Sequence, residues 1–319
     1  MKPKILYYEC LNFSENAIAF LNENFTVISK KDPTHDEDNL LETLDCIFAP
    51  LGYQTDEDKI KKCKKLKVIL SNTTGHPHID YQFAVAHNIK VACLKYEEAF
   101  LETITPTAEH TIGLMIALTR NYKQSMADVA KGNWSRQPFA GEKMLSRSVV
   151  GIVGMGRLGK KVAKALRAFD TTVIYSDPHV DSPNIPEARK VEFEVLLRSS
   201  DIITLHLHHS PETDKLISSA EISLMKEGAF LVNTSRGELL DWSALLDALK
   251  SGHLAGAAMD VIENEFAPNF TMKQSAMEVY QYINNYSNLI ITPHIGGSTK
   301  DAWEMTQMKT IEMALHYLR

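Results

Sequence analysis

The feature that most constrains this chain is an apolar run that breaks into three spaced glycines. Residues 149–153 have the composition of a buried strand, and Gly154-Met155-Gly156-Arg157-Leu158-Gly159 follows directly. The stretch from Lys160 to Phe169 then has the pattern of a helix, and residues 171–175 have that of a second strand. This order of strand, turn, helix and strand predicts the first unit of a doubly wound parallel α/β sheet.

Each glycine of this turn occupies a position where a larger residue would interfere with the fold or with a bound ligand. Gly154 permits the tight turn, Gly156 lets a pyrophosphate approach the backbone, and Gly159 lets the helix pack closely on the strand. The next N–H groups, those of Arg157 and Leu158 among them, lie at a helix N-terminus, where partial positive charge favours phosphate. We therefore expect a dinucleotide-binding site here.

An acid after the second strand bears on which dinucleotide binds. Asp177 lies eighteen residues after Gly159. A carboxylate there accepts hydrogen bonds from the ribose hydroxyls of the adenosine half and repels a 2′-phosphate. The sequence therefore favours NAD over NADP as the cofactor.

Composition narrows the class of protein. The 319 residues are enough for two domains, and a net charge of −6 gives no reason to expect a nucleic-acid partner. The four cysteines are scattered, which is typical of reduced thiols in a cytoplasmic protein. No stretch approaches the length of a membrane span, and the N-terminus has the pattern of a strand rather than a signal peptide. We expect a cytoplasmic protein with neither a membrane nor a nucleic-acid partner.

Short apolar strands alternate with helical stretches in two successive series, which predicts parallel sheets covered by helices. We expect two doubly wound (Rossmann or flavodoxin-like) α/β domains with a cleft between them. The expected strands of the first series are 4–8, 26–29, 46–49, 68–71 and 91–94. Those of the second series are 149–153, 171–175, 202–206, 230–233, 254–258 and 289–291.

The segment between the two series is a candidate contact for a second copy of the chain. Residues 109–121 are strongly apolar at helical spacing, and residues 122–148 are expected to form an irregular arm. A homodimer that uses the helix and arm, over residues 107–147, would bury this apolar surface. The alternative is a helix that lies wholly inside one subunit.

Polar residues follow three successive strands of the second series, and ligands bind at the carboxyl ends of parallel strands. Arg236, Glu265 and His294 are each 29 residues apart. The guanidinium is a planar, permanently charged donor for a carboxylate or carbonyl oxygen. The imidazole can take a hydroxyl proton as hydride leaves, while the glutamate, bonded to the other ring nitrogen, fixes the tautomer and stabilises the imidazolium. These residues predict a hydride-transferring enzyme that acts on a hydroxy acid or keto acid.

Metal binding and nucleophilic catalysis are the two alternatives to hydride transfer. His206 and His208 lie on the same face of an expected strand, which allows two metal ligands, but no third ligand has matching spacing. We therefore expect no metal. No Gly-x-Ser-x-Gly motif or reactive-cysteine motif indicates nucleophilic catalysis.

The motifs resemble those of the D-isomer-specific 2-hydroxyacid dehydrogenase family, and its phosphoglycerate-dehydrogenase-like branch looks closest. The resemblance is carried by Gly154–Gly159, Asn233–Gly237, Asp260 with Glu265, and Pro293–Gly297. It implies an NAD-dependent oxidoreductase acting on a small D-2-hydroxy acid, usually a homodimer, with Arg236, Glu265 and His294 in the roles given above. Further cofactor contacts are expected at Arg157, Leu158, His206, Thr234, Ser235, Asp260, Gly296 and Gly297.

The resemblance also implies a split substrate domain. Residues 1–104 and 295–319 would form the substrate domain, and residues 105–294 the cofactor domain. The family's carboxylate-binding loop corresponds to residues 71–80, in which His76, Pro77 and His78 depart from the family pattern.

Within that loop, we expect the backbone N–H groups of Thr74 and Gly75 to hold the substrate carboxylate. Lys95 would bind a second polar group of the substrate, and an exposed surface lysine is the alternative. Substrate contact by His76 or His78, the side chain of the acid, the physiological direction and the pathway stay open. Residues 266–288, longer and more polar than in the common form, are expected to shape the rim of the active site.

Two other functions compete with this reading. An NAD(H)-sensing interaction protein, like the family's transcriptional corepressors, would use the same fold. Oxidation of formate or phosphite is weaker, because a glutamate paired with His294 suits removal of a hydroxyl proton.

Overall fold

The computed structural model describes residues 2–141, 143–267 and 269–319, and the chain divides into two compact units. The first unit contains residues up to Ile104, a short segment that begins at Phe266, and residues from Ser298 onward. The remaining residues, between Thr105 and Gly297, form the second unit. Each unit has one parallel sheet covered by helices, so the expected pair of doubly wound α/β domains is confirmed.

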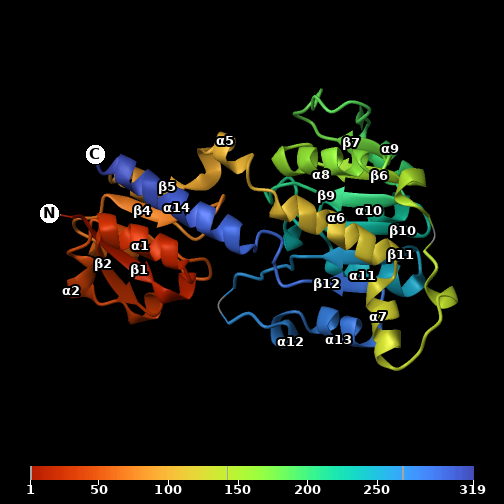
Figure 1. The fold of residues 1–319 in the computed structure, drawn as a ribbon, viewed down its shortest axis with the longest axis horizontal. Coiled ribbons are helices and arrows are strands. Elements are labelled where there is room, and N and C mark those ends of the chain that lie inside the picture. Colours follow the sequence, from red (N-terminus) through yellow and green to blue (C-terminus); the bar gives the residue numbers. More distant parts are fainter. Residues whose placement is uncertain (1, 142, 268) are drawn as a thin grey trace. The chain divides into compact units, whose positions relative to one another are not determined.

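The first unit is built on five strands: β1 (Lys4–Tyr8), β2 (Thr26–Lys30), β3 (Cys46–Phe48), β4 (Val68–Ser71) and β5 (Lys90–Cys93). Its helices are α1 (Glu15–Asn24), α2 (Asp38–Leu41), α3 (Glu57–Lys62), α4 (Tyr81–Ala86), α5 (Glu98–Leu101) and α14 (Lys300–Tyr317). The strand order is β2-β1-β3-β4-β5. Helices α1 and α14 pack side by side on the sheet (Figure 1). Right-handed crossovers place α3 and α4 on the opposite face.

The second unit has seven strands: β6 (Val149–Val153), β7 (Thr172–Ser176), β8 (Arg189–Lys190), β9 (Ile202–Leu205), β10 (Ala229–Asn233), β11 (Leu254–Met259) and β12 (Leu289–Ile291). Its helices are α6 (Pro106–Thr119), α7 (Tyr122–Ala130), α8 (Arg157–Arg167), α9 (Phe193–Ser199), α10 (Ser219–Leu224), α11 (Trp242–Ser251), α12 (Met272–Ser275) and α13 (Met277–Asn285). One apolar core lies under α6 and α8, and another lies under α9, α10, α11 and α13.

The strand order of the second sheet fixes where a ligand can bind. The order is β12-β11-β10-β9-β6-β7-β8, with all pairs parallel. The chain runs from β6 toward β8 on one side and from β9 toward β12 on the other. The direction of winding therefore switches between β6 and β9, and the carboxyl ends of these two strands flank a ligand-binding crevice in folds of this kind.

Three sequence expectations need correction. Helix α8 begins at Arg157 rather than Lys160, because Gly156 is already its N-cap. The arm is not irregular throughout, since residues 122–130 form α7, with Tyr122, Met126 and Val129 spaced along one helical face. The domain bounds differ at two places. Residues 295–297, expected in the first domain, group with the second unit because the N–H groups of Ile295 and Gly296 bind the carboxylate of Asp260. Phe266, expected in the second domain, groups with the first unit.

Two further observations concern the cysteine thiols and the apolar character of the helices. The thiols of Cys46, Cys63 and Cys93 are buried, that of Cys10 is exposed, and all four are free. Within the described ranges, no helix combines the length and the apolar character that crossing a membrane requires.

Candidate active site

The glycine turn after β6 has the close packing that its sequence predicts. Gly154 has a φ of +92°, and a Cβ atom there would lie 2.5 Å from the carbonyl oxygen of His206. A Cβ atom on Gly159 would lie 2.2 Å from the carbonyl oxygen of Gly154. Since His206 follows β9, these contacts hold the turn at the switch point of the sheet.

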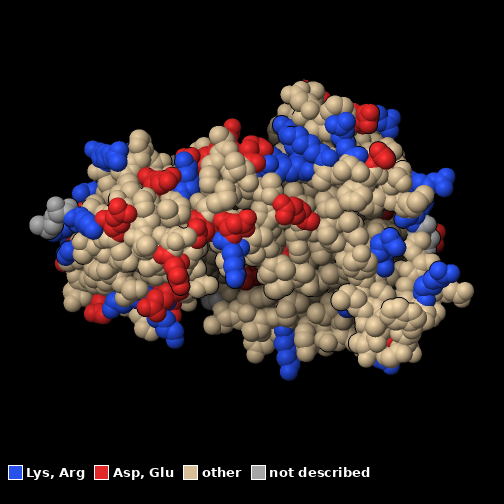
Figure 2. Space-filling view, viewed as in Figure 1, with Lys and Arg blue, Asp and Glu red and all other residues tan. Residues whose placement is uncertain are grey.

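The middle glycine faces open space instead. A Cβ atom on Gly156 would meet no atom within 4 Å, and no side chain caps the N-terminus of α8. Lysine and arginine side chains gather over α8 in Figure 2. The sequence of this helix contains Lys160, Lys161 and Lys164. Open backbone, uncapped N–H groups and nearby positive charge together fit the diphosphate of a dinucleotide.

Asp177 binds the backbone of the same turn. Its Oδ2 accepts a hydrogen bond from the N–H of Met155 at 2.7 Å, and its Oδ1 accepts from the N–H groups of His179 and Val180 at 2.7 and 3.0 Å. The carboxylate therefore ties the glycine turn to the loop after β7. It is also placed at the strand end where an adenosine ribose binds in doubly wound folds.

The loop after β10 is held by its own polar side chains. Asn233 donates from Nδ2 to the carbonyl of Arg236 at 2.7 Å and accepts from the N–H of Ser235 at 2.9 Å. Ser235 Oγ donates to the carbonyl of Leu205, and Thr234 Oγ1 lies 2.8 Å from Oγ1 of Thr111 on α6. The hydroxyls of Thr234 and Ser235 thus have protein partners.

Arg236 itself is half-buried, and its Nη1 donates to the carbonyl of Ser235 at 2.6 Å. A Cβ atom on the next residue, Gly237, would lie 2.1 Å from the backbone of Ile262, so the loop packs tightly on the segment after β11. The guanidinium is thereby presented from a fixed backbone.

His294 and Glu265 are brought together from the ends of β12 and β11, which are adjacent in the sheet. Nδ1 of His294 lies 2.8 Å from Oε2 of Glu265. Because a carboxylate accepts hydrogen bonds, this contact places a proton on Nδ1 and orients Nε2 of a neutral imidazole as the basic nitrogen. His294 also has a φ of +52°, a conformation that costs energy for a non-glycine residue and that clusters at functional sites.

The strained backbone of His294 is held by Asp260, whose side chain is 1% exposed. The Asp260 carboxylate accepts hydrogen bonds from the N–H groups of Ile295 and Gly296 at 2.9 and 2.7 Å, and from Oγ1 of Thr292 at 2.6 Å. Burial alone would raise the pKa of Asp260, but hydrogen bonds from these groups and from His110 outweigh burial and lower it. The buried carboxylate therefore stays ionised and holds the loop on both sides of His294.

His110 on α6 is a further member of this network, and no sequence motif indicates it. Its Nε2 lies 3.3 Å from Oδ1 of Asp260 and 3.0 Å from Oγ1 of Thr292. Its polar neighbours Glu109 and Thr111 leave it without a distinguishing local pattern. His110 links the helix expected at a dimer interface to the loop that carries His294.

His206 lies at the end of β9, beside the glycine turn. Its Nε2 is 3.0 Å from Oγ1 of Thr204, and its buried Nδ1 has no hydrogen-bond partner among the described residues. Burial lowers the pKa of His206 to about 4, so the ring is neutral near pH 7. In the described part of the chain, no three His, Cys, Asp or Glu side chains are grouped as a metal site requires.

The expected carboxylate loop belongs to the first unit and follows β4. Thr74 is exposed and Gly75 half-buried, whereas His78 is buried beneath the loop. The ring of His76 stacks on that of Tyr81, with centroids 4.7 Å apart. Lys95, after β5, is exposed, and its Nζ lies 5.5 Å from the centroid of the neighbouring Tyr96 ring.

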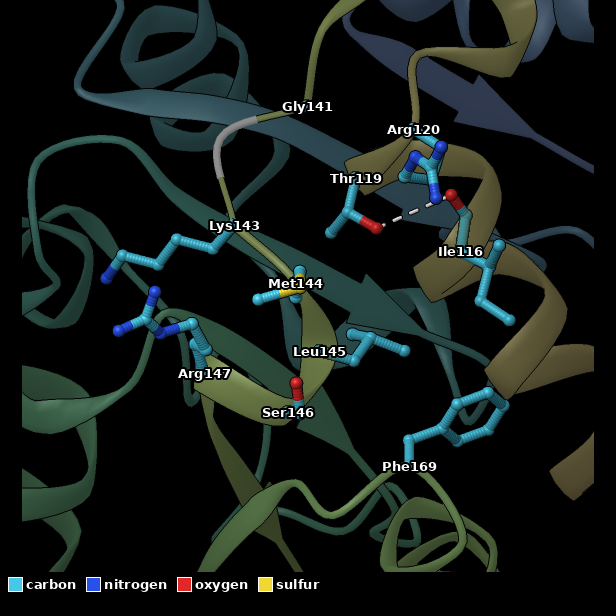
Figure 3. A pocket seen from close by; sticks show the side chains of 10 residues that line it. All are labelled: Ile116, Thr119, Arg120, Gly141, Lys143, Met144, Leu145, Ser146, Arg147 and Phe169. Carbon is cyan, nitrogen blue, oxygen red and sulfur yellow. Dashed lines mark hydrogen bonds between the residues drawn. The ribbon is translucent and has the colours of Figure 1, made fainter.

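A separate cavity of about 810 Å³ lies where the arm meets the end of α6 (Figure 3). Ile116 and Arg120 line one side, and Met144 and Leu145 of the arm line the other. Neither His294 nor Glu265 lines this cavity, which belongs to the arm.

Comparison with known proteins matches residues 112–296 to the D-isomer specific 2-hydroxyacid dehydrogenase, NAD binding domain. The chain is 30% identical over 323 residues to glyoxylate reductase of Thermococcus litoralis, with 95% of this chain and 90% of the relative covered. It is also 34% identical over 306 residues to D-3-phosphoglycerate dehydrogenase of Methanocaldococcus jannaschii, with 94% of this chain covered. The chain spans about half (54%) of that relative's length.

A solved structure with a similar fold is D-lactate dehydrogenase from Aquifex aeolicus complexed with NAD and lactic acid. The two chains superpose with a TM-score of 0.82 at 26% identity, and 98% of this chain and 95% of the other are covered. The likeness extends over both units.

Proposed function

The chain belongs to the D-isomer specific 2-hydroxyacid dehydrogenase family, and we propose on this premise that it interconverts a small D-2-hydroxy acid and the corresponding 2-keto acid. The observation that carries the proposal is the contact between His294 and Glu265, which presents an oriented imidazole at the end of a parallel sheet. A nicotinamide cofactor, when bound, accepts or supplies the hydride.

His294 would move the proton in this reaction. With Nδ1 bonded to Glu265, Nε2 takes the hydroxyl proton during oxidation and returns it during reduction. The Glu265 carboxylate, 2.8 Å from the ring, stabilises the imidazolium formed when the proton is taken. Asp260 is a positioning residue in this scheme, because it holds the backbone on either side of His294.

Arg236 would bind the substrate and polarise it. A guanidinium offers parallel N–H groups that match a carboxylate or a carbonyl oxygen, and its charge does not vary with pH in the working range. Its position after β10, with Glu265 after β11 and His294 after β12, puts the three residues on adjacent strands of one sheet. In the first unit, Thr74 and Gly75 are proposed to hold the carboxylate from the backbone, and Lys95 to bind a further polar group.

For the cofactor, we propose NAD rather than NADP. Asp177 is nearly buried, and its carboxylate is fixed by three backbone N–H groups. A 2′-phosphate would bring close to two negative charges beside it. Replacement of Asp177 by Ala should therefore raise the ratio of kcat/KM with NADPH to that with NADH, and an unchanged ratio would count against a ribose contact.

We further propose that the chain forms a homodimer through α6, α7 and the arm. Trp134 is 91% exposed and Met126 is 70% exposed, and Tyr122 and Val129 extend the same apolar surface along α7. A contiguous apolar patch of this kind favours burial against another protein surface. The adjacent arm cavity adds the apolar side chains of Ile116, Met144 and Leu145 to this surface, which supports a second copy of the chain as the occupant.

The test of the proposed activity is NADH consumption by the purified protein against a panel of 2-keto acids, run in parallel with NADPH. The panel would extend from glyoxylate and pyruvate to phosphorylated, dicarboxylic and sugar-derived acids. Turnover that His294→Ala abolishes, while NADH binding measured by fluorescence persists, would support the proposal. Binding of NADH by the wild-type protein without turnover of any acid would overturn it in favour of an NAD(H)-sensing protein.

A further inference from the structure

A chain of hydrogen bonds lies beneath the expected carboxylate loop. It starts at the buried ring of His78, which is 3% exposed and whose Nε2 lies 3.0 Å from the carbonyl oxygen of Ala49 and 3.2 Å from Oγ of Ser71. Oγ of Ser71 lies 2.7 Å from Oγ1 of Thr73, and Thr73 donates to the carbonyl of Gly75 at 2.5 Å. The chain thus runs from the ends of β3 and β4 into the loop itself.

The direction of this chain is fixed by its ends. A carbonyl oxygen can only accept, so the hydroxyl of Thr73 must donate to Gly75. That hydroxyl is then an acceptor for Ser71, whose oxygen shares the Nε2–H of His78 with the nearer carbonyl oxygen of Ala49. Burial lowers the pKa of His78, which favours the neutral ring, and the Ala49 carbonyl, which can only accept, places the single N–H of that ring on Nε2.

This arrangement determines which N–H groups the loop presents. In a trans peptide, the carbonyl and the following N–H point in opposite directions. The carbonyl of Thr73 accepts from the N–H of Leu94 at 3.0 Å, and the carbonyl of Gly75 accepts from the Thr73 hydroxyl. The N–H of Thr74 therefore points away from Leu94, and the N–H of His76 points away from the Thr73 hydroxyl.

The backbone of His78 is anchored without help from its side chain. Its carbonyl accepts from the N–H of Thr55 at 2.8 Å, and Ile79 forms a bridge with Thr55. A change of the His78 ring therefore acts on the loop above it more than on the chain path below.

We propose that His78 is a positioning residue for substrate binding, acting through Ser71 and Thr73 to fix the loop whose backbone N–H groups, that of Thr74 among them, bind the substrate carboxylate. The identity of the bound group rests on the proposed function, whereas the loop geometry does not. The departure of His78 from the family pattern thus has a structural role in this chain.

Two pairs of variants in the full chain test the proposal. In His78→Gln the amide nitrogen occupies the place of Nε2, whereas in His78→Asn it does not reach it. Thr73→Ser keeps the hydroxyl, and Thr73→Val removes it while keeping the shape. In His78→Asn and Thr73→Val, we expect the KM for the keto acid that the wild type reduces best to rise about tenfold. The kcat and the KM for NADH should stay within about threefold, and Gln and Ser should restore the wild-type KM.

A second readout does not depend on turnover. Proteinase K cleavage between residues 72 and 77, followed by mass spectrometry, should be several-fold faster in His78→Asn and Thr73→Val than in His78→Gln, Thr73→Ser and the wild type. Equal cleavage rates within each pair would overturn the positioning role. Faster cleavage in a protein that turns over no keto acid would confirm the hydrogen-bond chain and contradict only the proposed function.

Discussion

Nδ1 of His294 lies 2.8 Å from Oε2 of Glu265, and the two residues come from the ends of adjacent parallel strands. Glu265 is mostly buried, and the imidazole is partly exposed, so the carboxylate lies behind a ring that reaches solvent. A buried acid behind an exposed histidine is suited to orient the ring and to compensate its charge when it is protonated.

The first prediction concerns Glu265→Gln. The amide keeps the size of the side chain and can still accept from Nδ1–H, but it no longer compensates the imidazolium. We expect kcat to fall about 10- to 100-fold with little change in the KM for NADH. Steady-state kinetics would measure both, with Glu263→Gln, a half-buried acid on the same loop, as the control. A loss confined to KM would contradict the assigned role.

The local parts of this site were predictable because their signals are local. The turn from Gly154 to Gly159 is predicted by glycine spacing, and the contact of Glu265 with His294 follows from polar residues at the ends of neighbouring strands. Hydrophobic periodicity and residue composition are enough to predict an element's contacts when its neighbours along the chain are also its neighbours in the sheet.

The features that the sequence does not predict depend on contacts between residues far apart in sequence, or on surfaces that pack on no other part of the same chain. His110 and Thr292 are 182 residues apart, and no local pattern in α6 indicates that its one histidine turns to the loop of His294. The sequence predicts an irregular segment where α7 lies. None of the residues of α7 is buried, so the segment lacks the apolar pattern of a helix that packs on the core. The sequence predicts a domain boundary after residue 294, whereas the boundary lies after Gly297, because the hydrogen bonds from Asp260 to residues 295 and 296 are tertiary contacts that no local pattern indicates.

The second prediction concerns Asp260→Ala. The substitution leaves the buried N–H groups of Ile295 and Gly296 without their acceptor, and it removes the anion beside His110. We expect the free energy of unfolding of the second unit to fall by about 2–4 kcal/mol. Urea unfolding would measure it, and Asp247→Ala, an exposed acid on α11, should change it by less than about 0.5 kcal/mol. Similar losses in both variants would contradict the buried network.

The third prediction concerns pH and His206. Its pKa is about 4 in the folded protein and near 6.5 when unfolded, so between these values only the unfolded chain takes up the proton. The contribution of neutral His206 to the free energy of unfolding is therefore complete above pH 6.5. It is lost as the pH falls toward 4, by up to about 3 kcal/mol. His206→Gln lacks the group that titrates, so its free energy of unfolding should fall less than that of the wild type between pH 7.5 and pH 4.5. His209→Gln, at an exposed position, is the matched control. A difference that does not vary with pH would refute the assignment.

The last prediction concerns the arm. Trp134 and Met126 are the most exposed apolar side chains of this region, and large aromatic residues contribute most to protein interfaces when a partner buries them. Sedimentation of the wild-type protein should show a dimer, and Trp134→Ser should raise its dissociation constant at least about thirtyfold, the equivalent of 2 kcal/mol. Val195→Ser tests the specificity, because Val195 is 46% exposed on α9, outside the arm. Since His110 on α6 contacts Asp260, loss of the dimer should also lower kcat. A wild-type monomer, or equal effects of the two variants, would exclude the arm as the dimer interface.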